Sequence, residues 1–286
     1  MEILRTVHDL RRRVQAWRDE HYDVGLVPTM GALHAGHLSL LGLARTRADR
    51  VVTSIFVNPM QFAAHEDLGR YPRDEAGDAA KLEAAGCDLL FAPSAAEMYP
   101  QGFATKIIVE GVTAPLEGEA RPGHFAGVAT IVAKLFQQVQ PDVAAFGEKD
   151  YQQFLVIRKL VRDLDIPVEI LPGPTVREAD GLALSSRNAY LSPAERAIAS
   201  KLNAILREAV SALESGAKIF ETESKTFDAL LNAGFGPIDY VALRDANDLS
   251  ALPSERVERE ARLLVAAFLG KTRLIDNFAV RAARGM

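Results

Sequence analysis

Cysteine is almost absent from this chain of 286 residues, since Cys87 is the only one. A single cysteine excludes an internal disulfide and a cysteine-based zinc cluster, and it fits a reducing compartment. Long apolar runs are missing too: no stretch reaches the roughly 18 residues that suggest a membrane span, and the first residues carry no apolar signal core. We therefore expect a cytoplasmic protein with no membrane partner.

The chain also has no excess of basic residues. Its 33 lysines and arginines stand against 38 aspartates and glutamates, which gives a formal net charge of -5. A protein that binds the phosphate backbone of nucleic acids normally carries a basic excess, so we expect no nucleic-acid partner. A small anion held by a few local cations remains possible.

Short apolar runs alternate with longer helical patterns from residue 24 to about residue 171. This alternation predicts a Rossmann-like α/β domain, a doubly wound parallel sheet with helices on both faces. The expected strands are residues 24–27, 51–57, 88–91, 106–109, 143–146 and 168–170. The expected helices lie around residues 37–48, 75–85, 127–138 and 152–164.

The segment Leu171-Pro-Gly-Pro-Thr-Val176 predicts a domain boundary, because two prolines and a glycine do not continue a helix or a central strand. We expect a first domain over residues 1–174 and a smaller α+β domain over residues 175–286. The second would open with a polar loop and a long helix from Ser192-Pro193, and end in strands 239–243, 262–268 and 273–276 with a turn at Gly270-Lys271.

Two histidines three residues apart, His34 and His37, lie between the first expected strand and the following helix. Gly31 and Gly36 let the backbone turn sharply there, and the amides at a helix N-terminus attract anions. An ordinary surface turn would account for an isolated His-Ala-Gly-His. The flanking strand and helix favour a phosphate site.

Other polar groups also follow expected strands. Asn58 and Gln61 could orient a hydroxyl or a carboxylate, or belong to a plain Pro-turn. Tyr71 could add an aromatic wall or lie on an ordinary surface. Arg121 and His124 precede a helix, where capping or packing by His124 is slightly favoured over catalysis.

Two further clusters could supply cations and donors to a phosphate. Lys149 lies in Glu-Lys-Asp after a strand, where it could compensate developing charge; a solvated loop is the usual fate of such a run. The loop Ser185-Ser186-Arg187 could close over phosphates brought by the first domain, although alone it is a weak signal.

Together these segments resemble the pantoate–β-alanine ligases, a family of the nucleotidyltransferase superfamily with the paired-histidine motif. The resemblance covers nearly the whole chain, with Leu184 where the family often has methionine. The matching segments are VPTMGALHAGH, FVNPMQF, RPGHFAGV, FGEKDYQQ, ADGLALSSRN and LIDN.

The resemblance implies two steps: the carboxylate of pantoate attacks the α-phosphate of ATP to give pantoyl adenylate and pyrophosphate, and β-alanine then displaces AMP. It implies a homodimer, and Mg²⁺ with the ATP, for which Asp78 and Asp150 are candidate ligands. The implied catalytic residues are His34, His37, Lys149 and Arg187, with His37 as the proton donor. The implied nucleotide-binding residues are Met30, Gly31, Ala32, Leu33, His34, Ala35, Gly36, His37, Gly147, Glu148, Lys149, Asp150, Val176, Leu184, Ser185, Ser186 and Arg187. The expected substrate-binding residues are Asn58, Gln61, Tyr71 and Gln153.

Two alternatives stay open. A nucleotidyltransferase acting on a phosphorylated alcohol would share the histidine loop but would not need Asn58, Gln61 and Gln153. A non-catalytic nucleotide sensor would not need Lys149 together with the Ser-Ser-Arg loop. A fragment of an aminoacyl-tRNA synthetase is disfavoured by the acidity and by the lack of an evident RNA-binding extension.

Overall fold

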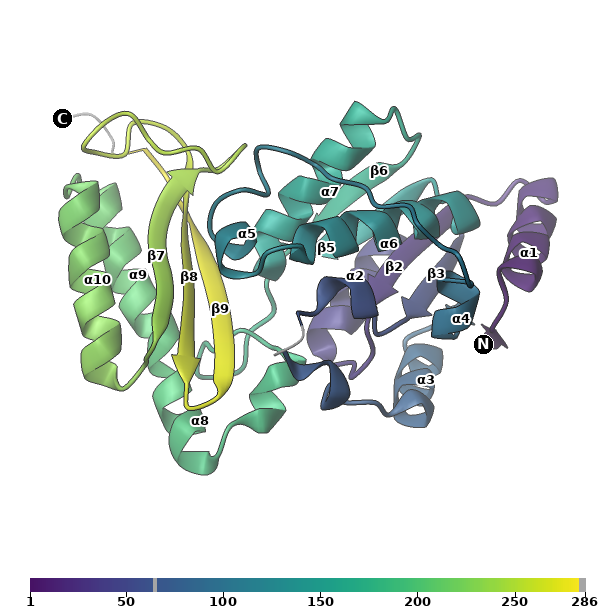
Figure 1. Ribbon diagram of the computed structural model, residues 1–286, viewed down its shortest axis with the longest axis horizontal. Helices are drawn as coiled ribbons and strands as arrows, with labels where there is room; N and C mark the ends of the chain where they lie inside the picture. Colours follow the sequence, from purple (N-terminus) through teal and green to yellow (C-terminus); the bar gives the residue numbers. More distant parts are fainter. Residues whose placement is uncertain (64–65, 283–286) are drawn as a thin grey trace.

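The computed structural model describes residues 1–63 and 66–282, and it contains two β-sheets (Figure 1). The larger sheet has six parallel strands in the order β1-β4-β3-β2-β5-β6, and the smaller is the antiparallel sheet β7-β8-β9. The predicted fold class, α/β with a smaller C-terminal domain, is confirmed. The strands are β1 Glu2–Leu4, β2 Val24–Thr29, β3 Arg50–Ile55, β4 Leu89–Phe91, β5 Val143–Gly147, β6 Glu169–Gly173, β7 Ile238–Asp245, β8 Ala261–Leu269 and β9 Thr272–Val280.

Helices cover both faces of the parallel sheet. Because side chains alternate along a strand, Leu26 joins the apolar cluster under α1, α6 and α7, whereas Val27 joins the cluster under α2 and α3. Both clusters are buried, as a doubly wound sheet requires. These helices are α1 Val7–Asp19, α2 Ala35–Arg45, α3 Glu75–Ala84, α6 His124–Val139 and α7 Tyr151–Asp163; the short helices α4 Ala95–Met98 and α5 Glu117–Ala120 lie in the connections.

The smaller sheet packs helices on one face and the larger domain on the other. Leu263 and Leu274 belong to the apolar cluster under α9 and α10, while Leu264 belongs to the core of the larger domain. Gly270, at φ +54°, makes the expected turn between β8 and β9. The helices here are α8 Pro193–Ala199, α9 Lys201–Glu214 and α10 Ile219–Ala233.

Three expectations about the elements need correction, and three elements were missed. Residues 106–109 pair with no strand in the described part of the chain, although Ile107 and Val109 face inward and the intervening Ile108 outward. β6 continues through Pro172 because it is an edge strand, where a missing N–H is tolerated. The single long helix after Ser192 is interrupted at Ser200, and β1, α1 and α10 were not anticipated. Within the described ranges, no helix is long and apolar enough to span a membrane.

Candidate active site

A cleft lies at the carboxyl ends of β2, β3 and β5, where parallel sheets bind ligands. Its far wall is a loop of residues 174–187 that leads into the smaller domain. Sixteen of the predicted site residues line it: Met30, His34, Gly36, His37, Asn58, Gln61, Tyr71, Gly147, Lys149, Asp150, Gln153, Val176, Leu184, Ser185, Ser186 and Arg187. In the described chain, Gly31, Ala32, Leu33, Ala35 and Glu148 are not part of its wall.

The two histidines cap the N-terminus of α2. Nδ1 of His34 accepts the N–H of Gly36 at 3.2 Å, and Nδ1 of His37 accepts the N–H of His34 at 3.3 Å. Because each Nδ1 is an acceptor, each neutral ring carries its proton on Nε2. Burial lowers the pKa of His34 to about 4, with help from Lys149, and burial lowers the pKa of His37 to about 3, with help from His34 and Lys149. Both rings are therefore neutral N–H donors at neutral pH.

Asp78 holds the turn that carries these histidines. Its buried carboxylate accepts the N–H of Ala32 at 2.7 Å and the N–H of Leu33 at 2.8 Å, and Lys81 lies 3.3 Å away. Gly31 and Ala32 both have positive φ, so the turn needs this support. The amides of Ala32 and Leu33 are thus engaged by the protein itself. Asp78 is likewise engaged, which argues against the hypothesis that it binds magnesium.

Asn58 holds Gln61 in place. Its Nδ2 donates to Oε1 of Gln61 at 3.0 Å and to the carbonyl of Gly127 at 3.2 Å, and the hydroxyl of Tyr99 donates to its Oδ1 at 2.7 Å. Asn58 is only 1% exposed. These bonds, and the Met60 N–H that its Oδ1 accepts at 3.2 Å, fix the 3₁₀ turn Pro59–Gln61 against α6, so that Gln61 reaches the cleft from a rigid support.

Lys149 enters the cleft from the 3₁₀ turn Glu148–Asp150, between β5 and α7. Its side chain is 20% exposed, and its Nζ lies 3.7 Å from Oδ1 of Asp150. The Glu148 side chain instead turns to Arg262 of the smaller domain, at 3.6 Å. Lys149 is therefore the cation that this turn presents to a ligand.

The loop with Ser185, Ser186 and Arg187 crosses to the larger domain. The Ser186 hydroxyl donates to the carbonyl of Ala32 at 3.0 Å. The Arg187 guanidinium donates to both carboxylate oxygens of Asp67, at 3.1 and 3.0 Å, and Asp67 was not anticipated from the sequence. These contacts bring the serines and the arginine opposite the histidines.

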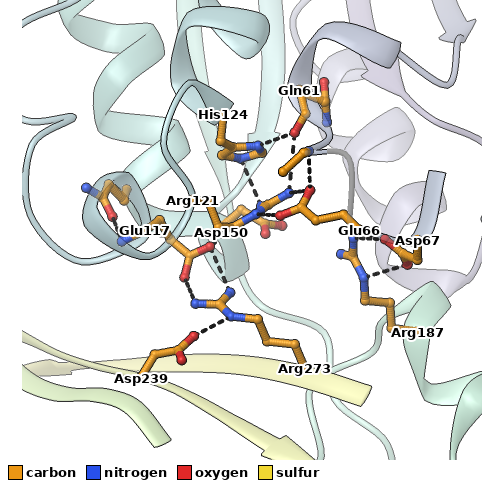
Figure 2. Close-up of polar contacts among 12 residues, drawn as sticks. Gln61, Glu66, Asp67, Glu117, Arg121, His124, Asp150, Arg187, Asp239 and Arg273 are labelled. Atoms are coloured by element: carbon orange, nitrogen blue, oxygen red, sulfur yellow. Dashed lines mark hydrogen bonds and ion pairs between the residues drawn. The ribbon is translucent and has the colours of Figure 1, made fainter. Parts of the chain in front are cut away.

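A partly buried network of charges beside the Gln61 backbone was largely missed from the sequence (Figure 2). Arg121 contacts Glu66 at 2.6 Å and, one helical turn back, Glu117 at 3.6 Å. Arg273 of β9 donates to both oxygens of Glu117, at 2.6 and 2.9 Å. Burial would raise the pKa of Glu117, yet its bonds from Arg273 hold that pKa below the usual range. Only the Glu117–Arg121 spacing of four residues is visible in the sequence.

His124 belongs to this network rather than to the cleft's donors. Nδ1 donates to the carbonyl of Gln61 at 2.9 Å, so Nε2, 3.1 Å from Arg121, accepts. Burial lowers the pKa of His124 to about 4, with help from Arg121. Figure 2 shows the ring directed at the Gln61 backbone, which agrees with the packing role favoured for it.

The cleft thus presents donors and cations from both walls to one space. The Nε2–H groups, Lys149, the Ser185 hydroxyl and Arg187 suit a polyanion and would stabilise charge that develops on it.

Known proteins resemble the chain over nearly its whole length. Residues 2–279 match the family model described as pantoate-beta-alanine ligase. A pantothenate synthetase from Caulobacter vibrioides is 59% identical over 97% of this chain and 98% of its own, and one from Rhodospirillum rubrum is 56% identical over 98% and 99%.

Solved structures agree with these relatives. A pantothenate synthetase from Thermus thermophilus superposes with a TM-score of 0.91 at 50% identity, covering 97% of this chain and 99% of the other. A pantoate-beta-alanine ligase from Francisella tularensis, complexed with beta-gamma ATP and β-alanine, has a TM-score of 0.83 at 35% identity, with 97% of each chain covered.

Proposed function

This chain belongs to the pantoate–β-alanine ligase family and joins pantoate to β-alanine with ATP, and we propose that it does so through pantoyl adenylate in the cleft described above. One observation carries the proposal: neutral histidine donors, a lysine and a Ser-Ser-Arg loop surround the same space as two glutamine side chains, Gln61 and Gln153. Cations and donors suit the nucleotide phosphates, and the amides suit the hydroxyls and carboxylate of pantoate.

In the first step, a carboxylate oxygen of pantoate attacks the α-phosphorus of ATP, and the bond from that phosphorus to the bridging oxygen breaks to release pyrophosphate. His34 and His37 donate from Nε2 to phosphate oxygens, and Lys149 and Arg187 offset the charge that grows on the leaving group. The nucleotide's negative charge raises the pKa of both histidines, so that a larger fraction of His37 is protonated and has a proton to donate once ATP is bound.

In the second step, the amine of β-alanine attacks the acyl carbon of the adenylate. A new carbon–nitrogen bond forms, the bond from the acyl carbon to the phosphate-linked oxygen breaks so that AMP leaves with the former carboxylate oxygen, and the proton of the amine passes to solvent. Gln61 and Gln153 hold the pantoyl group still through both steps, with Tyr71 as a wall. Positioning supplies much of the rate enhancement, and no covalent bond to the enzyme is needed.

Magnesium enters with the nucleotide. Mg²⁺ commonly binds one or two carboxylates together with substrate phosphates and water, and Asp150 at the cleft wall, with its side chain 48% exposed, fits that need. When bound, the ion would neutralise phosphate charge. We assign Gly147 and Val176 to the adenosine.

The C-terminal part acts as a lid in this proposal. Residues 1–174 hold the nucleotide and pantoate, and residues 175–286 cover them through the Ser185–Arg187 loop. Its contacts to Ala32 and Asp67 support this division. We also place the protein in the cytoplasm, where a buried free thiol such as Cys87 stays reduced.

We further propose that the chain is a homodimer, as members of this family are expected to be. Ile108 is 71% exposed and Leu164 is 55% exposed, and both line one surface groove. Ile108 belongs to a segment with a strand-like pattern and no strand partner in the described residues, which a second copy could cover. An Ile108→Asp variant should sediment as a monomer, while Phe220→Asp, on the equally exposed surface of α10, should remain dimeric; dimeric Ile108→Asp would refute the interface.

The decisive experiment is turnover with ATP, pantoate and β-alanine, with the nucleotide product identified. We expect AMP and pyrophosphate, and adenylate formation from ATP and pantoate alone. His37→Ala and Lys149→Ala should fold normally and lose adenylate formation, and Gln153→Ala should mainly raise the KM for pantoate. Formation of ADP would refute the adenylate route, and near-normal turnover of a variant would refute the role of that residue.

A further inference from the structure

The motif Leu274-Ile-Asp276-Asn277 places two buried polar side chains on β9, and neither has a role so far. Neighbouring side chains on a strand point to opposite faces. Leu274 packs under the helices of the smaller domain, so Asp276 shares that face, whereas Asn277 faces the larger domain. Asp276 is 2% exposed and Asn277 is 4% exposed. Asn277 also lines a small cavity between the domains that Lys149 borders.

The Asn277 carboxamide has a partner for each of its two ends. Nδ2 donates to the carbonyl of Glu148 at 3.0 Å and to the carbonyl of Lys149 at 2.8 Å. Oδ1 accepts the Nε–H of Arg262 at 2.6 Å. A carbonyl can only accept and a guanidinium can only donate, so this orientation of the amide is the one that satisfies all three groups.

The turn that carries Lys149 has little support of its own. The 3₁₀ turn Glu148–Asp150 begins at Gly147 without a side-chain cap, and α7 begins after Asp150 without one. The local sequence therefore leaves the direction of the Lys149 side chain weakly determined. Asn277 supports the turn in another way, by donating from a strand of the other domain to two of its backbone carbonyls.

Arg262 in turn holds Asn277. Its guanidinium lies over the ring of Tyr151 at 4.0 Å from the centroid, and it pairs with Glu148 at 3.6 Å. The Arg262 side chain is 11% exposed, so its orientation is fixed by packing. The amide of Asn277 is thus clamped between a buried cation and the Lys149 turn.

We propose that Asn277 is a positioning residue for catalysis, which sets the place of Lys149 from the smaller domain. Asp276 acts on the opposite wall of the cleft. It accepts two hydrogen bonds from Arg177, of 2.7 and 2.9 Å, and Arg177 lies near the start of the loop that carries Ser185 to Arg187. The strand β9 therefore fixes the position of the Lys149 turn on one wall of the cleft relative to the Ser185–Arg187 loop on the other. The inference rests on the proposed role of Lys149.

The test is Asn277→Asp, which keeps the shape and replaces the donor with an oxygen that repels two carbonyls. We expect kcat for adenylate formation, and its kcat/KM for ATP, to fall together by at least tenfold, with the KM for pantoate changed less than threefold. The matched control is Asn203→Asp. Asn203 is 6% exposed and also accepts an arginine Nε–H, from Arg207 at 2.9 Å, but does not contact Lys149; its rates should change less than threefold.

A double-mutant cycle separates positioning from a structural role. The cycle uses the slow residual adenylate formation of Lys149→Ala, followed in single turnover with excess enzyme. If Asn277 acts through Lys149, adding Asn277→Asp should slow that residual rate less than threefold. An equal loss in both backgrounds, or normal kcat in the single variant, would overturn the inference. Should Asn277→Asp not fold, Asn277→Ala takes its place in the same cycle. Full activity of Lys149→Ala alone would instead refute the proposed function of Lys149.

Discussion

Replacing Gly127 by alanine should separate two elements that the cleft needs in contact. Gly127 lies in α6 where the helix meets the 3₁₀ turn Pro59–Gln61, and an added Cβ would strike the carbonyl oxygen of Met60 and lie 2.5 Å from its carbonyl carbon and 2.6 Å from the nitrogen of Gln61. Ordinary carbon contacts are roughly 3.5–4.0 Å. Because both sides are backbone, α6 and the turn must move apart by about 1 Å.

The magnitude follows from three effects. Overpacking of this kind costs about 1–3 kcal/mol, and stretching the bond from Asn58 to the Gly127 carbonyl, now 3.2 Å, forfeits about 1 kcal/mol more. Alanine returns about 1 kcal/mol through its helix propensity. We expect Gly127→Ala to lower the free energy of unfolding by about 2 kcal/mol, and kcat/KM for pantoate by roughly 10²-fold, because Gln61 moves with the turn.

Urea unfolding and steady-state kinetics with varied pantoate measure both effects. The matched control is Gly42→Ala in α2, where an added Cβ meets nothing within 4 Å. The same propensity gain applies there without a clash, so this variant should be stabilised by about 0.5–1 kcal/mol and keep its activity. Unchanged stability and unchanged kcat/KM in Gly127→Ala would refute the reasoning.

Two further predictions concern buried titratable groups. The pKa of His37 is about 3 in the folded protein and roughly 6.5 when unfolded, so the unfolded chain binds the extra proton and stability falls as pH drops from about 6.5 towards 3. His37→Asn should therefore lose less stability than the parent between pH 7 and pH 5, by about 2 kcal/mol; identical slopes for the two proteins in urea unfolding would contradict this. Glu117→Gln should cost about 1.5–3 kcal/mol in urea unfolding, because Arg273 loses the carboxylate that accepts two of its hydrogen bonds and keeps only Asp239 as a charge partner. Glu169→Gln, in a pair that is about half exposed on each side, should cost less than about 1 kcal/mol; equal costs would show that burial does not decide the worth of these pairs.

The hydrophobic periodicity and the positions of glycine and proline were sufficient to predict most strands and helices of the larger domain. Strands 24–27 and 143–146 and the helix around residues 127–138 were anticipated within a few residues, because a buried parallel strand is continuously apolar and a helix has a 3.6-residue period. The expected strand at 106–109 failed for a physical reason. The side chains there alternate between buried and exposed, as they do in a strand. A strand must also pair with the edge of a neighbouring strand, and in the described residues this segment does not.

Much of the candidate site was also visible, since the groups that would meet the substrates come in short segments after strands. His34, His37, Lys149 and Arg187 lie around one cleft. What could not be predicted is the set of groups that hold them. Asp67 meets Arg187 across 120 residues, and no spacing or period reports such a pair.

The sequence by itself determined the alternation of strands and helices, and the segments that would bear the chemistry, because both depend on residues near one another in the chain. The tertiary structure decided the protonation state of the side chains in these segments and the positions in which they are held. Burial makes His34 and His37 neutral donors, and Asn277, on a strand of the second domain, holds the backbone of Lys149. Desolvation and long-range hydrogen bonds exist only once distant segments pack together, so these properties arise in the fold alone.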